Sequence, residues 1–538
     1  MPAEARASIA RPLQHPVETF TEAERTRLAP HVTNLDRPVF ALVNLPETVK
    51  GALFARYSRY QGTLRRLFLD EFAESAPQGH VWEGAEGRRA AELYERIFLG
   101  YGDDSVAQLG GAHVACEWVS NVLTKVLQRP RLAAYLEQST RYIPYDTPMP
   151  GGGYRYYRDP ELGPHYEHAM DAVFDAYATA LPRVAAWVES EFPGDDSPAR
   201  RRAIQAKALD LLRGLLPAAS LSHMGIYASG QTYEQLILHL LAHPLPEARQ
   251  YGQMILEAVQ AVMPSFVTRV ERPDRGGEWI AYLEGRERAA DRWVRRLGLD
   301  RESEPDARPS VSLLHVDGDE DALLAALLFE AAGVGEEETR IRLAALSGAE
   351  RTEMLSELIG VRANRRHRPG RGFEALRYRF EIVSDYGAFR DLQRHRMLTV
   401  KWQRLTPHLG AGVPDEVQAA GCGDLYRHAL DVSRTEWERL VGEGREREAL
   451  YALSLGYRIR YVLDLNAREA MQLIELRSGR EGHPSYRAVA HEMHRLIAQV
   501  HPAVAGAMTH VDTEAEPRLE RILSEMRTQA KIDALSGP

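Results

Sequence analysis

The stretch Leu127-Gln-Arg-Pro-Arg-Leu132 occurs a second time in the chain as Leu392-Gln-Arg-His-Arg-Met397. Both arginines keep the same offset, since 394 − 129 = 265 and 396 − 131 = 265. A weaker match joins Leu215-Leu-Pro-Ala-Ala-Ser-Leu221 to Ala452-Leu-Ser-Leu-Gly456, and an amphipathic segment follows each of them. Matches that recur in the same order are the mark of a repeated unit. The repeat predicts two diverged copies of one domain, joined head to tail.

The segment between the two copies reads as a helix followed by a linker. Apolar residues from Trp279 to Leu297 recur at helical spacing, and the polar run from Arg301 to Pro309 follows them. The predicted layout is an N-terminal extension at 1–37, a first domain at 38–270, the helical segment and linker at 271–309, and a second domain at 310–538.

Each copy is expected to begin with β-structure and continue with long helices. Residues Arg377 to Val383 alternate as a strand does, and Tyr386 to Arg396 continue as a helix, while Ala112 to Gln128 read as strand followed by helix. The second copy opens on a strand at Ser310 to Val316 and an apolar helix that runs through Phe329. The predicted fold class is α+β, with two tandem domains, each a β-sheet packed with long helices, that form an intrachain pseudo-dimer.

Composition narrows the class of protein. The chain has 538 residues, 44% of them hydrophobic and 27% charged, which is a globular balance for two or three domains. The net charge of −9 argues against a DNA-binding surface. Two cysteines, Cys116 and Cys422, exclude a disulfide framework and fit a reducing compartment. No apolar run reaches the roughly 18 residues that span a bilayer, so we expect a cytoplasmic protein without a membrane partner.

The segment from Arg129 to Tyr142 carries the densest set of ligand-binding side chains. Arginines at 129, 131 and 141 offer charge-assisted donors to phosphate, and Glu137 offers an acceptor to a heterocycle N–H. This combination suits a nucleotide. The alternative is a solvated loop held by salt bridges, which charged segments commonly are.

The same segment resembles the signature of the flavin-dependent thymidylate synthases, which reads Arg-His-Arg, two residues, Ser, one residue, Asn-Glu, one residue, Ser, one residue, Arg-Tyr. Copy one matches this signature at Arg129, Arg131, Glu137, Ser139, Arg141 and Tyr142. It has Pro130, Ala134 and Leu136 in place of the signature's His, first Ser and Asn. Copy two matches it at Arg394, His395 and Arg396, with Thr399 for the first Ser, and then departs at Lys401, Trp402, Arg404 and Thr406. Each copy has kept a different half.

Downstream matches divide in the same way. In the family, an arginine before a Leu-Pro binds the nucleotide, and copy one has Arg213 there whereas copy two has Leu450. The family's later residues for flavin and pyrimidine correspond to Asn466, Arg468 and Arg477 in copy two, but to Ser229, Gln231 and Leu240 in copy one. Two serines that contact flavin in the family resemble Ser58 and Ser105.

The resemblance implies the reductive methylation of dUMP to dTMP with FAD, with methylenetetrahydrofolate and NADPH as co-substrates. It assigns flavin binding to Arg394, His395, Arg396, Asn466, Arg468, Ser58 and Ser105, and nucleotide binding to Arg129, Arg131, Glu137, Ser139, Arg141 and Arg213. His395 would stack on the flavin ring or hydrogen-bond it. Arg477 would lie beside the pyrimidine carbonyl as the catalytic residue, stabilising negative charge as hydride reaches C6.

Family members are homotetramers with sites at subunit interfaces, so the resemblance implies a homodimer of this chain, a pseudo-tetramer, with one hybrid site between the copies. Two alternatives to a thymidylate synthase stay open. One is a catalytically degenerate or retooled homologue that binds a nucleotide or flavin, and the other is a methylase of another uridine nucleotide. A metal site is not expected, because His491 and His494 lack a nearby third ligand in the sequence.

Overall fold

The computed structural model describes residues 15–16, 18–45, 47–57, 59–73, 108, 110–149, 151–194, 196–300, 308–514, 527 and 530. The chain divides into two compact units. Unit 1 comprises Met1–Thr179, Leu215–Glu302 and His428–Ser454, and unit 2 comprises Ala180–Gly214, Ser303–Arg427 and Leu455–Pro538. A segment of copy one, 180–214, therefore belongs to unit 2, and a segment of copy two, 428–454, belongs to unit 1.

Unit 1 is built on an antiparallel four-stranded sheet in the order β1-β2-β4-β3. Its strands are β1 (Val39–Ala41), β2 (Gly111–Ser120), β3 (Ala133–Glu137) and β4 (Leu221–Ser229). Strand β2 is buried along most of its length, and β4 has only one exposed residue. Strand β4 is a central strand, paired with β2 on one side and with β3 on the other. Helix α6 (Asn121–Leu127) follows β2 directly.

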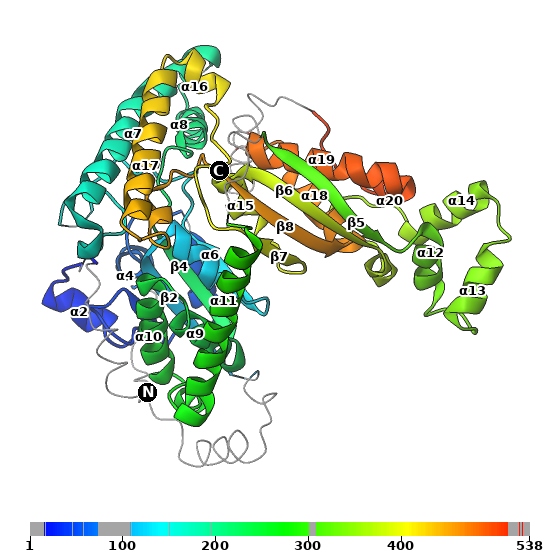
Figure 1. Cartoon of the computed structure of the whole chain (residues 1–538), viewed down its shortest axis with the longest axis horizontal. Helices are drawn as coiled ribbons and strands as arrows, with labels where there is room; N and C mark the ends of the chain where they lie inside the picture. The colour runs from blue at the N-terminus through cyan, green and yellow to red at the C-terminus, as the bar shows by residue number, and fades with distance from the viewer. Residues whose placement is uncertain are drawn as a thin grey trace. The chain divides into compact units, whose positions relative to one another are not determined.

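Among the helices of unit 1, α10 packs on the sheet against β1 and β2, and it also packs against α9 (Figure 1). The helices are α2 (Glu22–Leu28), α3 (Glu47–Tyr57), α4 (Leu64–Leu67), η1 (Phe68–Phe72), η4 (Pro160–Leu162), most of α7 (Gly163–Glu191), α9 (Gly230–Leu241), α10 (Pro246–Gln260), η5 (Pro264–Val267), η6 (Pro273–Gly277), α11 (Glu278–Leu297), most of α17 (Gly423–Gly442) and η8 (Ala449–Ala452). Helix α11 confirms the helix that was predicted between the copies.

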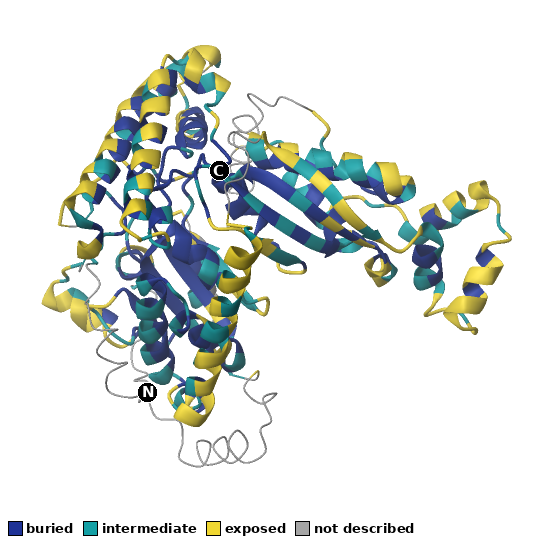
Figure 2. Cartoon of the chain, in the orientation of Figure 1, coloured by how far each residue is buried: buried dark blue, intermediate teal, exposed yellow. Residues whose placement is uncertain are grey.

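Unit 2 is built on a second antiparallel sheet of the same kind, in the order β5-β6-β8-β7. Its strands are β5 (Ser310–Asp317), β6 (Arg377–Asp385), β7 (Thr399–Trp402) and β8 (Arg458–Asn466). Strand β8 alternates between buried and half-buried residues, as a strand with one face on the core does. The alternation is visible along β6 and β8 in Figure 2.

Helix α19 covers this sheet by packing on β5, β6 and α18. The helices of unit 2 are the end of α7, α8 (Pro198–Leu212), α12 (Glu320–Leu328), α13 (Glu336–Leu343), α14 (Gly348–Ile359), η7 (Arg371–Ala375), α15 (Tyr386–Leu392), α16 (Asp415–Ala419), the start of α17, α18 (Ala467–Arg477), α19 (Pro484–Val500) and α20 (Pro502–Gly506). The predicted strands at 310 and 377 and the predicted helix at 386 are thus confirmed, although α15 ends at Leu392, before the arginines.

The two sheets repeat one another in topology and in detail. In unit 1 the backbone N–H of Gln138 donates to the His223 carbonyl at 2.9 Å, and in unit 2 that of Gln403 donates to the Arg460 carbonyl at 3.0 Å. Gln138 and Gln403 are again 265 positions apart. The fold class predicted from the sequence, α+β with a tandem duplication, is confirmed.

A buried carboxyl in unit 1 gives a prediction about pH. Glu247 of α10 accepts hydrogen bonds from the Ser120 backbone N–H at 2.8 Å, the Ser120 hydroxyl at 2.7 Å and the Tyr451 hydroxyl at 2.7 Å. Burial nevertheless raises the pKa of Glu247 to about 7 from 4.5. The unfolded chain therefore loses this proton at a lower pH than the folded chain does. Between about pH 4.5 and pH 7 the folded state binds more protons, so stability falls as pH rises.

We expect Glu247→Gln to remove up to about 1.4 kcal/mol per pH unit of this fall. The amide keeps an acceptor oxygen and cannot ionise, while the serine and tyrosine hydroxyls can reorient. Chemical denaturation at pH 5, 6 and 7 measures the slope. Glu117 is also fully buried and its pKa is also raised to about 7, so part of the slope should persist in the variant. A variant with the same slope as the parent would contradict the prediction.

Candidate functional site

The candidate site in unit 2 is centred on the three residues that follow helix α15. Asp385 caps the start of this helix by accepting the Ala388 N–H at 2.8 Å, and the helix ends at Leu392. Arg394 and Arg396 are exposed, whereas His395 between them is only 6% exposed. The turn therefore sends one imidazole into the unit and leaves two guanidinium groups at its surface.

His395 is held through both ring nitrogens. Its Nδ1 lies 2.9 Å from Oε1 of Glu469, and its Nε2 accepts a hydrogen bond from Nε of Arg477 at 3.1 Å. A guanidinium has donors and no acceptor, so Nε2 must carry the lone pair and Nδ1 the proton. Burial lowers the pKa of His395, which favours the same neutral ring. Both ring nitrogens of His395, for which the resemblance implied stacking on or hydrogen bonding to a flavin, are thus engaged by protein side chains.

Asp391 joins two of the predicted arginines. Its Oδ2 lies 3.0 Å from Nη1 of Arg213, and its Oδ1 lies 3.6 Å from Nη1 of Arg394. Arg213 stands at the C-terminal end of α8, in the part of copy one that belongs to unit 2. A residue predicted to bind nucleotide in copy one and a residue predicted to bind flavin in copy two thus meet at one carboxylate.

The guanidinium of Arg213 keeps two further donors beside this pair. The residue is 3% exposed, and its Nε and Nη2 have no hydrogen-bond partner. Gly387 borders them, because a Cβ at this position would lie 3.1 Å from Nε and 3.2 Å from Nη2. A buried guanidinium with open donors is costly unless an anion or water meets them. The glycine leaves that edge free of a side chain.

Asn466 and Arg468, for which the resemblance implied flavin binding, each make a contact with the backbone of the protein. Asn466 is the N-cap of α18, and its side chain accepts the Glu469 N–H at 2.9 Å. Arg468 donates from Nε to the Pro369 carbonyl at 3.0 Å, and its Nη1 lies 3.7 Å from Glu374. The structure brings Arg477 to His395, but the contacts of Arg468 lead to residues 369–374.

The capping role of Asn466 can be separated from a ligand-binding role by two substitutions. Asn466→Ala should lower stability by about 1 kcal/mol, because it removes an N-cap. Asn466→Ser should stay within about 0.5 kcal/mol of the parent, since serine caps well, and Ser229 caps α9 at the corresponding place in unit 1. Denaturation of both variants measures this. Equal losses for alanine and serine would mean that the amide does more than cap the helix.

The predicted nucleotide loop lies in unit 1 and shows two kinds of environment. Arg129 and Arg131 are exposed between α6 and β3. Glu137, at the end of β3, is buried, and its Oε2 lies 2.9 Å from Nζ of Lys125 and accepts from Gln128 at 2.9 Å. A fully solvated loop is therefore wrong for Glu137. It is a buried ion-paired carboxylate, whose partner Lys125 the motif does not include.

The remaining loop residues lie just beyond β3. Ser139 and Arg141 are both half-buried, and the Ser139 hydroxyl accepts the Arg141 backbone N–H at 3.2 Å. Ser58 and Ser105 lie outside the described residues. Unit 1 thus holds Arg129, Arg131, Glu137, Ser139 and Arg141, and unit 2 holds the others that can be placed.

Sequence reasoning missed Glu469, Asp391 and Lys125. Two of them stand at helical spacing from motif residues, since Asp391 precedes Arg394 by three positions and Glu469 follows Asn466 by three. Residues three apart on a helix or at its N-cap are neighbours, so this spacing was an available signal. Lys125 lies twelve positions before Glu137, and local spacing could not have found it.

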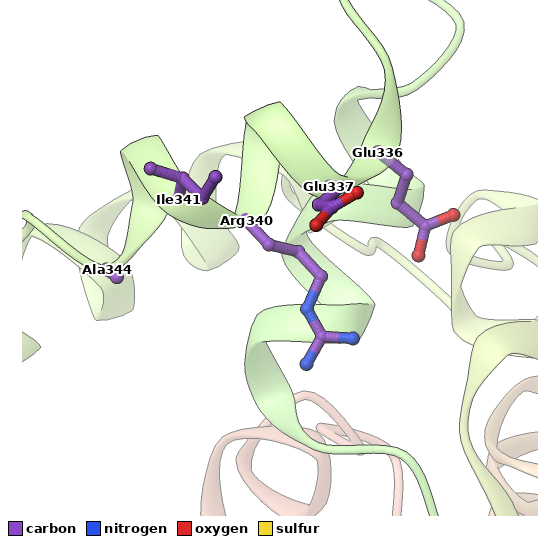
Figure 3. Close-up of a pocket in the computed structure, with 5 residues that line it drawn as sticks. All are labelled: Glu336, Glu337, Arg340, Ile341 and Ala344. Carbon is purple, nitrogen blue, oxygen red and sulfur yellow. The ribbon is translucent and has the colours of Figure 1, made fainter.

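Two other features contain none of the predicted site residues. A surface hollow on α13 is lined by Glu336, Glu337, Arg340, Ile341 and Ala344 (Figure 3). His491 and His494 each face a backbone carbonyl, of Asp512 and Ala505 respectively. Across the part of the chain that the structure describes, no cluster of three or more potential metal ligands was found, and no helix is both long and apolar enough to cross a membrane.

The chain is similar to several known proteins. The family described as thymidylate synthase complementing protein matches it in two regions, residues 58–265 and 319–503. The UPF0159 protein of Chlamydia muridarum is 36% identical over 529 residues, which cover 95% of this chain and 99% of that protein. The UPF0159 protein of Thermoplasma acidophilum is 31% identical over 523 residues, which cover 90% of this chain and 99% of that protein.

A solved structure with some similarity is the UMP/dUMP methylase PolB from Streptomyces cacaoi bound with 5-Br dUMP. It is 21% identical and covers 38% of this chain and 97% of its own, with a TM-score of 0.31. A second structure of that methylase, bound with 5-Br UMP, gives a TM-score of 0.29. Similarity at this level says nothing about what this chain binds.

Proposed function

Because the chain belongs to the thymidylate synthase complementing protein family, we propose that it is a flavin-dependent enzyme that methylates dUMP to dTMP. The observation that carries the proposal is the meeting of Arg213 and Arg394 at Asp391, at 3.0 Å and 3.6 Å. Arginines that lie close together bind phosphate oxygens well, because each offers several charge-assisted donors. This contact supports one hybrid site that takes residues from both sequence copies.

The residues of unit 2 fit a flavin nucleotide on physical grounds. Arg394 and Arg396 are exposed on either side of a buried imidazole, where they can reach pyrophosphate oxygens. The open donors of Arg213 beside Gly387 offer a place for a further anionic group. FAD would supply hydride and relay a one-carbon unit, with NADPH and methylenetetrahydrofolate as co-substrates.

In this proposal Arg477 is the catalytic residue, because it would contact the reacting pyrimidine. Its Nε donates to His395 Nε2, and its guanidinium carbon lies 5.5 Å from the centre of the Tyr486 ring, so two neighbours hold the side chain. A fixed cation next to a pyrimidine carbonyl stabilises the negative charge that develops when hydride reaches C6. In unit 1, the residues that would contact the nucleotide are Arg129, Arg131, Glu137, Ser139 and Arg141. We propose a homodimer as the assembly.

A second candidate function is supported by the ion pair of Glu137. Its carboxylate is fully buried and bonded to Lys125, which lowers its capacity to accept a base N–H. Each copy has also lost half of the family's signature. These observations favour a homologue that binds a nucleotide or flavin without thymidylate synthase activity.

Two measurements on the full chain test the proposal. The purified protein should be yellow or take up added FAD, and heat should release the flavin. The gene should support growth of a thymidine-requiring strain without thymidine, and Arg394→Ala and Arg141→Ala should each abolish that growth. Arg427→Ala is the matched control, because Arg427 is also exposed and pairs with an aspartate three residues earlier, at 2.7 Å.

The outcomes separate the candidates. Growth that the two arginine variants lose and the control keeps supports the hybrid site. A protein that binds FAD and dUMP but gives no growth supports the second candidate. A colourless protein that rejects FAD overturns the flavin-dependent enzyme, and only a homologue that binds a nucleotide without flavin is left.

A further inference from the structure

We propose that Glu469 is a positioning residue that holds the proton of His395 on Nδ1 and thereby holds Arg477 in place. The three side chains form a relay in unit 2, from carboxylate to imidazole to guanidinium. The inference deepens the proposed function, and it rests on that function only for what Arg477 faces. The relay itself is a statement about which atom carries a proton.

The geometry of the relay requires one tautomer. Arg477 donates from Nε to Nε2 of His395 at 3.1 Å, and Glu469 Oε1 lies 2.9 Å from Nδ1. If Nε2 carried the proton, two N–H groups would face one another and Nδ1 would place a lone pair against a carboxylate. If both nitrogens were protonated, the contact with Arg477 would again be lost. Only the Nδ1–H tautomer satisfies all three side chains.

Burial makes this choice strict. Glu469 and His395 are each 6% exposed, so water cannot readily replace a lost hydrogen bond. The pKa of His395 is lowered by burial, and Arg477 and Arg396 lower it further, whereas Glu469 raises it. The two arginines thus oppose an imidazolium, and the carboxylate settles which nitrogen of the neutral ring is protonated.

The local sequence explains how Glu469 reaches the imidazole. Asn466 caps α18 and fixes Glu469 in its first turn, at the position whose N–H the cap binds. Arg477 stands in the last turn of the same helix. One short helix therefore presents both partners of His395, and the contacts hold the end of α15 against it.

Unit 1 has the same fold but not the same relay. The counterparts of His395, Glu469 and Arg477 in copy one are Pro130, Thr232 and Leu240. Thr232 instead donates to the Leu132 carbonyl at 3.2 Å. The relay is therefore not a requirement of the helix-on-sheet fold, since a sister unit forms that fold with other side chains.

The test is a long-range ¹H–¹⁵N correlation spectrum of the full chain labelled with ¹⁵N-histidine. His395 is assigned by its absence from the spectrum of His395→Gln. At pH 7.5 we expect its ring to show the Nδ1–H pattern in the parent. In Glu469→Gln we expect the Nε2–H form to appear alongside Nδ1–H, because the amide can donate to Nδ1 as well as accept from it, so that only Arg477 still favours the proton on Nδ1.

Glu475→Gln is the matched control. Glu475 is a buried carboxylate on the same helix, but it pairs with Arg362 at 2.6 Å and does not contact His395. This control should leave the His395 pattern unchanged. A parent spectrum with Nε2–H or imidazolium overturns the inference, even if Glu469→Gln does not fold. An unchanged pattern in Glu469→Gln also overturns it.

Flavin content and activity are measured on the same samples. If the parent shows Nδ1–H and Glu469→Gln changes it, the relay stands even in a protein that binds no flavin, and only the proposed function fails. If the parent is active, Glu469→Gln should lower kcat at least tenfold and leave KM for dUMP within a few-fold, since Arg477 is displaced rather than removed. Glu469→Asp, which keeps a carboxylate, should recover part of this loss.

Discussion

Replacing Asp391 by alanine should lower the free energy of unfolding of unit 2 by about 3 to 5 kcal/mol, because it strands a buried guanidinium. Arg213 is 3% exposed, and Asp391 accepts from its Nη1 at 3.0 Å while Nε and Nη2 have no partner. Without the carboxylate no acceptor would face any of its nitrogens. Amide hydrogen exchange of α8 and α15 in graded denaturant measures the loss where it occurs.

Asp424→Ala is the control for this prediction. Asp424 pairs with Arg427, an arginine three residues later, just as Asp391 pairs with Arg394, but the Asp424 side chain is 99% exposed. Exposed pairs contribute at most about 1 kcal/mol, so this variant should be close to the parent. A loss below about 1 kcal/mol for Asp391→Ala would show that Arg213 finds water or another acceptor, and that the pair is not an essential part of the unit.

The double variant Arg213→Leu with Asp391→Leu separates stability from ligand binding. Replacing both members of a buried ion pair by apolar residues is often neutral, whereas removing one member is not. We therefore expect the double variant to regain most of the lost stability. Nucleotide and flavin binding should stay weaker than in the parent, because the Arg213 donors to phosphate are gone. Calorimetric titration with dUMP and FAD measures the second effect.

The repeat was enough to predict the duplicated fold. Arg129 and Arg394 share the offset of the repeat, and each lies just after the helix that follows a strand of its own sheet, α6 in unit 1 and α15 in unit 2. Strand alternation in β6 and the helix at α15 were also evident, since both patterns are local. What the sequence could not show is the exchange of segments. Residues 180–214 belong to unit 2, and no local pattern says which sheet a helix will pack on.

The same limit applies to the site. The motif pointed to Arg213, Arg394, His395 and Arg477. In unit 2, Arg213 and Arg394 both lie against Asp391, and Arg477 donates to His395. The motif could not indicate that Asp391 would be the carboxylate between two arginines. The resemblance implied flavin binding for Asn466 and Arg468. The sequence did not show that Asn466 also caps α18 or that Arg468 also bonds to the Pro369 carbonyl, because polar side chains that suit a ligand suit backbone groups as well.

Lys125→Met should lower the free energy of unfolding of unit 1 by about 3 to 5 kcal/mol, because it leaves Glu137 buried without the ammonium group. Both side chains are 1% exposed, and Nζ lies 2.9 Å from Oε2. The loss should be larger at pH 8 than at pH 5, since at low pH the carboxyl can take up a proton instead of remaining an uncompensated charge. Hydrogen exchange of α6 and β3 at the two pH values measures it.

Lys207→Met in unit 2 is the matched control. Lys207 is also buried, with a side chain 7% exposed, but Glu416 is 21% exposed and 3.5 Å away, so water can solvate the carboxylate that remains. This variant should lose no more than about 1 kcal/mol. Adding Glu137→Gln to Lys125→Met should restore most of the stability and remove the pH dependence. If dUMP instead protects Lys125→Met more strongly than the parent, Glu137 is available to the nucleotide, and the active-enzyme proposal gains over the degenerate homologue.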